Sequence, residues 1–303
     1  MKEKQTRGID PLAEALVGGV WVRSMPLIFV FLWSTGFIGA KFGLPHAPPV
    51  TFLLLRFALV VVLMLPLALL FRAPWPKSPR QVAHIGVSGM LLHGGYLGGV
   101  FAAIYFGMSA GLVSLIAGLQ PILTAFAAVP LLDERVSLRQ WFGLLLGLSG
   151  VALVVLQKVS LSGLAALPIG LSLIALVSIT MGTVYQKRYC APFDLRAGLV
   201  IQFVAAGLVL LPFGVAFETM RVEWATEFVF ALAWLCLVLS LGATSVLWVL
   251  IQRGAAAEVA SLFYLVPPVT AIEGYLLFGE TLTAIQMAGI GITAVGVAII
   301  NRS

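Results

Sequence analysis

The fold is decided by residues 113–152, VSLIAGLQPILTAFAAVPLLDERVSLRQWFGLLLGLSGVA, because residues 259–298, VASLFYLVPPVTAIEGYLLFGETLTAIQMAGIGITAVGVA, repeat the same pattern. The two stretches are 146 residues apart, and twelve of their forty aligned positions are identical without a gap. The identical positions include Pro121 with Pro267, Glu134 with Glu280, and Gln140 with Gln286. The same offset holds from about residue 26 to residue 300. The chain therefore consists of two homologous halves.

The composition indicates a protein embedded in a membrane. Hydrophobic residues make up 61% of the 303 residues, only 10% are charged, and the mean hydropathy is +1.08. A water-soluble domain carries about a quarter of its residues as charged ones. Since only helices and closed barrels satisfy their backbone groups inside lipid, the long apolar runs predict helices of about 20 residues. The two cysteines, Cys190 and Cys236, are too few and too far apart to indicate a disulfide framework or a metal site.

Apolar runs separated by proline, glycine and charged residues predict ten membrane-spanning helices, five in each half. They lie at residues 26–44, 50–71, 82–106, 110–132, 140–157, 164–186, 196–217, 228–252, 256–278 and 283–300. Because five is odd, the second half enters the membrane from the opposite side, so the two halves are inverted relative to each other. We therefore predict an all-α polytopic membrane protein. Its predicted parts are an N-terminal segment at 1–25, a first repeat at 26–157 and a second repeat at 164–300.

The basic residues predict the orientation. Fourteen lysines and arginines fall on the side of the N-terminus, whereas only Lys158 and Arg221 fall in loops on the other side. Because positively charged loops stay in the cytoplasm, we predict that both termini are cytoplasmic, in a bacterial-type inner membrane. The net charge of +6 therefore reflects orientation, and no nucleic-acid partner is expected. The first 24 residues predict either a helix lying on the membrane surface or a disordered tail, and not a cleaved signal peptide.

Several of these features together resemble the EamA family of the drug/metabolite transporter superfamily. They are two five-helix halves, each with a proline in the fourth helix and a glutamate thirteen residues later, an early Trp33, and Arg56 followed by Phe57 in the second helix. The chain is most similar to the YddG-type amino acid exporters. The resemblance implies export of small metabolites, with aromatic and other apolar amino acids favoured. Gln120 and Val266 replace the glutamate that commonly precedes the proline, so no carboxylate role is carried over to them.

Pro121 and Pro267 occupy matching places in the two halves. In transporters built from inverted repeats, helices interrupted at matching places mark the transport site near the middle of the membrane. A proline bends the helix and leaves the backbone carbonyl one turn back without its N–H donor. That carbonyl can then accept a hydrogen bond from a solute. A packing kink without any solute contact is the alternative.

Polar and aromatic residues form stripes on corresponding helices. One stripe joins His93 and Tyr96, and another joins Gln120 and Thr124, one turn apart. A third stripe, in the eighth span, carries Ser245, Trp248 and Gln252. Any one of these residues alone can instead be an interhelical hydrogen bond or a core aromatic. The predicted substrate-binding residues are His93, Tyr96, Gly99, Gln120, Pro121, Thr124, Ser245, Trp248, Gln252, Tyr264 and Pro267.

Few ionisable residues fall inside the predicted spans. A charge at the bilayer centre costs about 2.5–3.5 kcal/mol on insertion scales, so each must face the protein interior or reach the membrane surface. We expect Lys41 and Arg56 to reach the surface and to be structural. Glu273 is the candidate buried carboxylate, and Glu273 and His93 are the candidates for coupling transport to protons.

Small residues four apart recur in the fifth and tenth spans. They are Gly143 with Gly147, and Gly289 with Thr293. Such pairs let helices approach closely, so we expect tight helix packing or a dimer face there.

We predict a secondary transporter that works by alternating access through a central cavity. Short loops leave no room for a nucleotide-binding domain, and no phosphate-binding loop exists, so neither ATP, another cofactor nor a metal is expected. No HExxH motif or Ser/His pairing supports an intramembrane enzyme. The alternatives are an exporter of another small metabolite or drug, an enzyme, or a channel. The expected partners are a small-molecule substrate and the lipid bilayer. A zwitterionic substrate is favoured, because helix dipoles and freed carbonyls can bind its two charges. We expect the chain to be a monomer or a weak homodimer.

Overall fold

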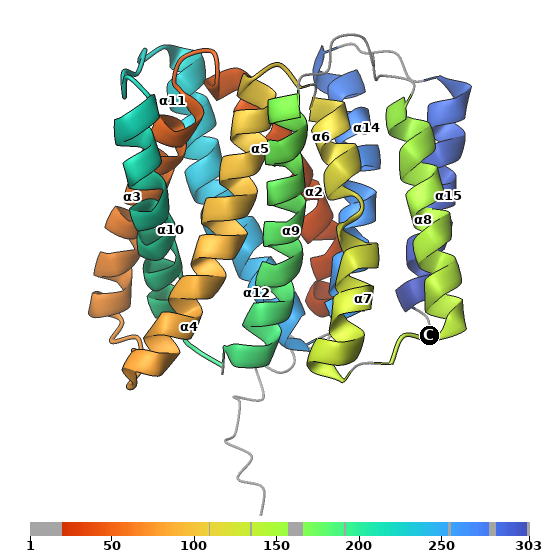
Figure 1. Cartoon of the computed structure of the whole chain (residues 1–303), viewed down its shortest axis with the longest axis horizontal. Helices are drawn as coiled ribbons and strands as arrows, with labels where there is room; N and C mark the ends of the chain where they lie inside the picture. Colours follow the sequence, from red (N-terminus) through yellow and green to blue (C-terminus); the bar gives the residue numbers. More distant parts are fainter. Residues whose placement is uncertain are drawn as a thin grey trace, which may run out of the picture.

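The computed structural model of the chain is a bundle of helices (Figure 1). It describes residues 20–108, 110–133, 135–156, 166–190, 192–253, 256–278 and 283–301. All regular secondary structure in these ranges is helical, which confirms the predicted fold class. The helices are α2 (Val20–Gly43), α3 (Pro49–Leu70), α4 (Pro79–Gly89), η1 (Met90–Gly95), α5 (Tyr96–Tyr105), α6 (Ala110–Ala117), α7 (Gln120–Leu132), α8 (Leu138–Leu156), α9 (Ala166–Tyr189), α10 (Leu195–Phe217), α11 (Thr226–Trp234), η2 (Leu235–Ala243), α12 (Thr244–Arg253), α13 (Ala256–Ser261), η3 (Leu262–Leu265), α14 (Val266–Phe278) and α15 (Ala284–Asn301). The predicted surface helix near the N-terminus lies mostly outside the described residues.

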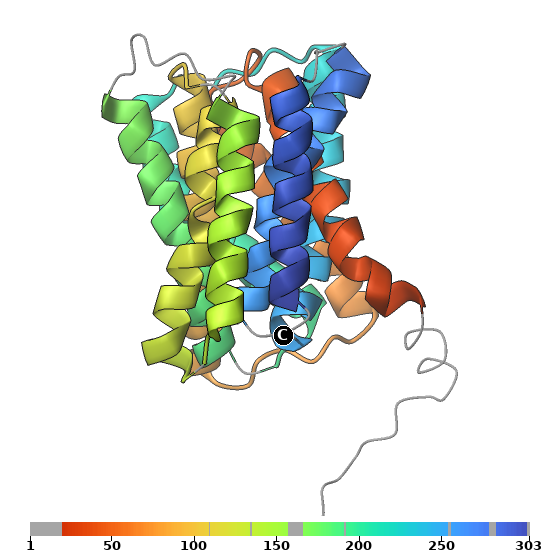
Figure 2. The same ribbon diagram turned by 90° about the vertical axis from the view of Figure 1, so that its right-hand side faces the viewer.

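Corresponding helices of the two halves run in opposite directions. In Figure 1, α3 runs downward, whereas α10, its counterpart in the second half and its neighbour in space, runs upward. Figure 2 shows that α2 begins and α15 ends on the same side of the bundle. This arrangement is the inverted repeat that an odd number of spans per half requires.

The helices have the length and the surface of membrane spans. Within the described residues, five helical runs, among them the 27-residue run Pro79–Tyr105, are long and apolar enough to cross a membrane, and five shorter apolar helices accompany them. α3 and α10 expose apolar side chains such as Val62, Leu69, Leu208 and Val215. Lipid tails are as apolar as these side chains, so exposing them to lipid carries no penalty. The protein is therefore a multi-pass membrane protein.

The helices are interrupted at matching places in the two halves. The π-helix η1 covers Met90–Gly95, and the repeat offset carries these positions onto 236–241, inside the π-helix η2. The fourth span divides between α6 and α7 just before Pro121, and the ninth contains the 3₁₀-helix η3 just before Pro267. The prediction that prolines mark breaks in both helices is confirmed. π-helical segments within α-helices are rare and occur mostly at functional sites, so the matched pair indicates where function lies.

Small residues hold α8 against α15. A Cβ atom added to Gly143 would lie 2.8 Å from the carbonyl oxygen of Gly296, and one added to Gly150 would lie 2.6 Å from that of Gly289. Larger side chains would push the two helices apart. The predicted close packing is confirmed, and it joins the two halves of one chain.

A carboxylate from the second half caps a helix of the first. The Glu218 side chain accepts hydrogen bonds from the backbone N–H groups of Val50 and Thr51, over 2.8 and 2.7 Å, and from the Thr51 hydroxyl over 2.7 Å. The first N–H groups of a helix have no partner within the helix, and the helix dipole favours a negative charge there. Glu218 therefore fixes the end of α10 to the beginning of α3.

Candidate functional site

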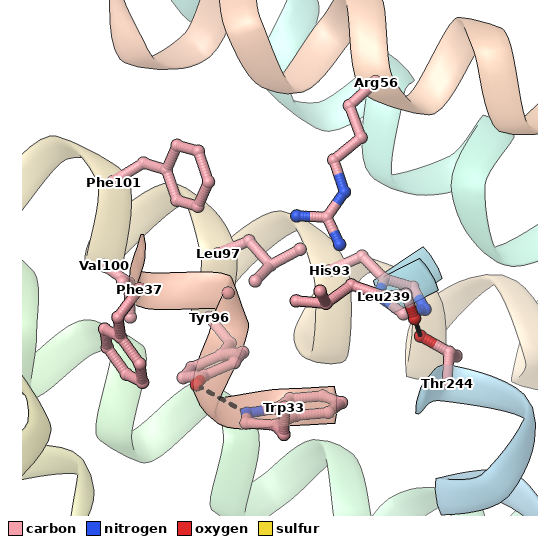
Figure 3. Close-up of a pocket in the computed structure, with 11 residues that line it drawn as sticks. Trp33, Phe37, Arg56, His93, Tyr96, Leu97, Val100, Phe101, Leu239 and Thr244 are labelled. Atoms are coloured by element: carbon pink, nitrogen blue, oxygen red, sulfur yellow. Dashed lines mark hydrogen bonds between the residues drawn. The ribbon is translucent and has the colours of Figure 1, made fainter. Parts of the chain in front are cut away.

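A central cavity lies where the third and eighth spans meet α2 and α3 (Figure 3). The free space inside it is about 30 Å³. Residues of the second half, Leu239 and Thr244, complete a lining that comes mostly from the first half. The aromatic and polar part of that first-half lining is Trp33, Phe37, Arg56, His93, Tyr96 and Phe101. The cavity thus lies between the two repeats, beside both π-helices.

Trp33 and Tyr96 form one wall of the cavity. The indole Nε1 of Trp33 donates to the Tyr96 hydroxyl over 3.3 Å, and the two rings lie 18° from parallel with centroids 6.2 Å apart. Phe29 and Phe263 pack against the Trp33 ring at centroid distances of 5.1 and 5.3 Å. Because these contacts hold the indole in place, the wall is a rigid aromatic surface, as apolar binding pockets usually have.

A second, smaller cavity adjoins the first and shares Trp33, His93 and Thr244 with it. It extends to Trp248. The His93 ring stacks on Phe203, with centroids 4.3 Å apart and planes 18° from parallel. Within the described part of the chain, Nε2 of His93 and the indole Nε1 of Trp248 are buried without a hydrogen-bond partner. Buried polar groups are nearly always paired, so these two are the groups that a bound solute or water would satisfy.

Arg56 corrects one expectation from the sequence. It was expected to reach the membrane surface, yet only 3% of its surface is exposed and its side chain points into the central cavity (Figure 3). Arg56 is seven residues into α3, about 10 Å from the helix start, so its neighbours α10 and η2 surround it. Its Nε donates to the Ser240 hydroxyl over 2.8 Å. The cavity therefore contains a cation.

Three of the predicted substrate-binding residues line the two cavities: His93, Tyr96 and Trp248. They come from η1, α5 and α12. The structure brings them together with Trp33 from α2. Both residues of the third-span stripe, His93 and Tyr96, line a cavity, whereas of the eighth-span stripe Trp248 does and Ser245 does not. Substrate binding by these residues stays a prediction.

Other predicted residues of the same spans lie elsewhere. A Cβ atom added to Gly99 would lie 2.5 Å from the carbonyl oxygen of Leu171, so Gly99 allows α5 to contact α9. The Ser245 hydroxyl donates to the carbonyl oxygen of Leu241, one turn back in η2. The side chain of Gln252 lies outside the described residues.

The predicted residues beside the proline breaks form a separate group. Gln120, Pro121, Thr124, Tyr264 and Pro267 are buried, and none of them lines the two cavities. In the described part of the molecule, both amide atoms of Gln120 and the hydroxyls of Thr124 and Tyr264 have no hydrogen-bond partner. These groups are polar sites inside the bundle, and their contact with a solute stays a prediction.

Glu273 connects α14 to α2. One of its carboxylate oxygens accepts a hydrogen bond from the Ser34 hydroxyl over 2.5 Å, and the other is buried without a partner among the described residues. Ser34 directly follows the cavity residue Trp33. Glu273 is thus a buried carboxylate, as predicted, and its coupling role stays a prediction.

Sequence reasoning missed several cavity residues, above all Phe37, Leu239 and Thr244, and misplaced Arg56. Apolar residues such as Phe37 and Leu239 carry no signal that separates them from the rest of an apolar helix. Arg56 did carry one, because an ionisable residue inside a membrane span marks a functional site by default.

Comparisons with known proteins agree with this architecture. The EamA-like transporter family matches residues 21–156 and 166–302. A "Probable amino-acid metabolite efflux pump" of Salmonella typhimurium is 30% identical over 278 residues, covering 88% of this chain and 89% of that protein. A protein of the same description from Escherichia coli is 27% identical, covering 88% and 89%.

A solved crystal structure shares the fold. Its TM-score is 0.75 at 18% sequence identity, and the match covers 92% of this chain and 96% of the other. At this identity the likeness concerns the fold alone, whereas the family match covers both repeats. The chain therefore belongs to the EamA-like transporter family and is a membrane transporter rather than an enzyme.

Proposed function

We propose that this protein exports amino acids, with aromatic and other apolar side chains favoured, by alternating access through the central cavity. The observation that carries the proposal is the cavity between the two inverted halves, with an aromatic wall and a few polar groups. Such a lining suits a solute that has an apolar side chain and a small charged part. Two similar proteins described as probable amino-acid metabolite efflux pumps support the same substrate class.

The matched interruptions provide the hinges for alternating access. π-helices and proline breaks are places where the backbone changes direction, and this chain has them at equivalent positions in both halves. Alternating access in inverted-repeat transporters is largely the rocking of one repeat against the other around a fixed site. We infer that bending at η1 and η2 opens the cavity to one side of the membrane at a time.

Glu273 and His93 are the proposed proton-coupling groups. Each has a buried atom with no partner in the described part of the chain, and each is ionisable. Glu273→Gln is expected to abolish acceleration of transport by a pH gradient while leaving solute exchange intact. A variant that still responded to the gradient like the wild type would exclude Glu273 from coupling.

The orientation is part of the proposal. We place the N-terminal segment 1–25 and the C-terminus in the cytoplasm of a bacterial-type inner membrane, with repeats at 26–157 and 164–300. The distribution of lysine and arginine supports this placement.

The experiment that tests the function is transport of a panel of labelled amino acids by the purified protein in liposomes, with and without a pH gradient and without ATP. We expect saturable transport that favours phenylalanine and leucine over aspartate and lysine. Trp248→Ala and Tyr96→Ala should change the ranking of bulky against small amino acids, because both residues line the cavities. Trp141→Ala is the matched control, since its ring packs on Phe126 at a centroid distance of 4.6 Å, away from both cavities. Absence of amino-acid transport, or a requirement for ATP, would refute the proposal.

A further inference from the structure

Arg56 is a buried cation whose hydrogen-bonding capacity the protein leaves partly unused. Its Nε donates to the Ser240 hydroxyl over 2.8 Å, and that hydroxyl in turn donates to the carbonyl oxygen of Leu235 over 3.1 Å. This chain of bonds fixes the guanidinium. Its Nη1 is buried without a partner, and among the described residues no carboxylate forms an ion pair with it. A buried charge without a counter-ion is strongly destabilising. We therefore expect an anion to bind beside Arg56.

The two halves treat this position differently. The repeat offset of 146 residues aligns Arg56 with Gln202, as it aligns Phe57 with Phe203. The Gln202 side-chain amide donates to the Ser88 hydroxyl and to the Gln186 side-chain oxygen, both over 2.9 Å. At this position the first half has a cation whose Nη1 has no hydrogen-bond acceptor among the described residues. The second half has an amide whose nitrogen donates to two acceptors within the protein.

The residues around the guanidinium favour a solute that has a negatively charged end and an apolar end. Figure 3 shows Arg56 extending into the cavity from one side, with Trp33, Phe37 and Tyr96 on the other. A planar guanidinium binds a carboxylate through two parallel hydrogen bonds, and an aromatic wall binds an apolar side chain. An organic cation placed here would meet a like charge instead.

We propose that Arg56 binds the carboxylate of the transported solute and thereby restricts transport to solutes that carry one. This inference rests on the proposed function and narrows it, because it requires the α-carboxylate of an amino acid and disfavours the corresponding amine. The Ser240 hydroxyl positions the guanidinium for that contact.

The test uses three solutes that share one phenyl ring: phenylalanine, 3-phenylpropionate, which lacks the ammonium group, and phenethylamine, which lacks the carboxylate. Each competes with labelled phenylalanine for transport by the full chain in liposomes. The wild type should be inhibited by phenylalanine and 3-phenylpropionate far more strongly than by phenethylamine. Arg56→Gln should raise the KM for phenylalanine about 10- to 100-fold, the loss expected for charge-assisted hydrogen bonds, and should remove the difference between 3-phenylpropionate and phenethylamine.

Two further variants separate charge from position. Arg56→Lys keeps the charge but not the paired donors, so an intermediate KM is expected. Ser240→Ala keeps the guanidinium and removes its acceptor, which should raise the KM for both carboxylates and leave phenethylamine unchanged. Arg80→Gln is the matched control, because Arg80 is an exposed arginine at the beginning of α4 and should not alter selectivity.

Folded Arg56→Gln protein with the wild-type ratio of inhibition constants would overturn the inference and leave amino-acid export standing. Preference of the wild type for phenethylamine would overturn it as well. If Arg56→Gln does not fold, the inference is tested by two other measurements. These are the ranking of the three competing solutes in the wild type and the KM of Arg56→Lys for phenylalanine. If the wild type transports no amino acid, the proposed function fails, and binding of 3-phenylpropionate against phenethylamine, followed by tryptophan fluorescence, still tests the role of Arg56.

Discussion

Replacing Gly99 with alanine separates a packing role from a role in substrate binding. The added Cβ atom would lie 2.5 Å from the carbonyl oxygen of Leu171 and 2.9 Å from the Cβ of Ala175, both on α9. The first contact is with backbone, so α5 and α9 must move apart. Overpacking of this kind costs about 1–3 kcal/mol. Alanine also favours a helix over glycine by about 0.5–1 kcal/mol, so the net loss of unfolding free energy is smaller than the contact cost alone.

Gly170→Ala is the matched control for Gly99→Ala. Gly170 is also a helical glycine and lies on α9, the helix that Gly99 contacts. A Cβ atom added to Gly170 meets nothing within 4 Å. Because the gain in helix propensity is common to both variants, the difference between their unfolding free energies isolates the contact cost of about 1–3 kcal/mol. The measurement is reversible unfolding in mixed detergent micelles, combined with the KM for phenylalanine.

We expect Gly99→Ala to be less stable than Gly170→Ala, with the KM of the remaining folded protein close to that of the wild type. Equal stability of the two variants would refute the packing assignment. A changed KM at unchanged stability would instead restore Gly99 to the substrate site.

Three further predictions concern the ends of the helices and the loops that connect them. Glu218→Gln should lower the unfolding free energy by about 1–2 kcal/mol, measured by the same unfolding, because it removes the charge that accepts three hydrogen bonds at the start of α3. The Arg196 guanidinium, hydrogen-bonded to Asp194, holds the pKa of that carboxyl below its usual value. The stabilisation from this ion pair is complete above the ordinary aspartate pKa of about 4 and is lost as the pH falls through the lower pKa of the folded state. Asp194→Asn lacks this stabilisation at every pH, so its melting temperature should fall less steeply below pH ~4 than that of the wild type. A thiol introduced at Arg221 should react with an impermeant reagent on intact cells, whereas one at Lys77 should not, because the two loops lie on opposite sides of the membrane.

Each of these predictions has a contrary outcome. Glu227→Gln, at an exposed glutamate in the first turn of α11, should lower the unfolding free energy by less than about 1 kcal/mol, the size of an exposed charge–dipole interaction, so equal losses in Glu227→Gln and Glu218→Gln would remove the capping argument. Parallel acid melting curves for Asp194→Asn and the wild type would show that the ion pair is without effect. Labelling at Lys77 but not at Arg221 would reverse the orientation.

The sequence by itself determined the membrane class, the all-helical fold and the inversion of the halves. Long apolar runs leave lipid as the only compatible solvent, and a repeat of five spans must return upside down. Pro121 and Pro267 also predicted the two breaks in the fourth and ninth spans, because proline removes a backbone donor wherever it stands. Glycine spacing predicted either tight helix packing or a dimer face at the fifth and tenth spans, since close approach depends on the absence of side chains, and the structure shows the packing of α8 on α15.

Only the tertiary structure decided which of these residues meet. Arg56 and Ser240 are 184 residues apart, and no local pattern connects them. The π-helices add a second reason. Their i→i+5 hydrogen bonds shift the face that following residues present, so α-helical spacing counted from the start of the third or the eighth span predicts the directions of the later residues incompletely. The sequence therefore determines a helical membrane protein of two inverted halves, whereas the packing of these halves selects the side chains that share a cavity.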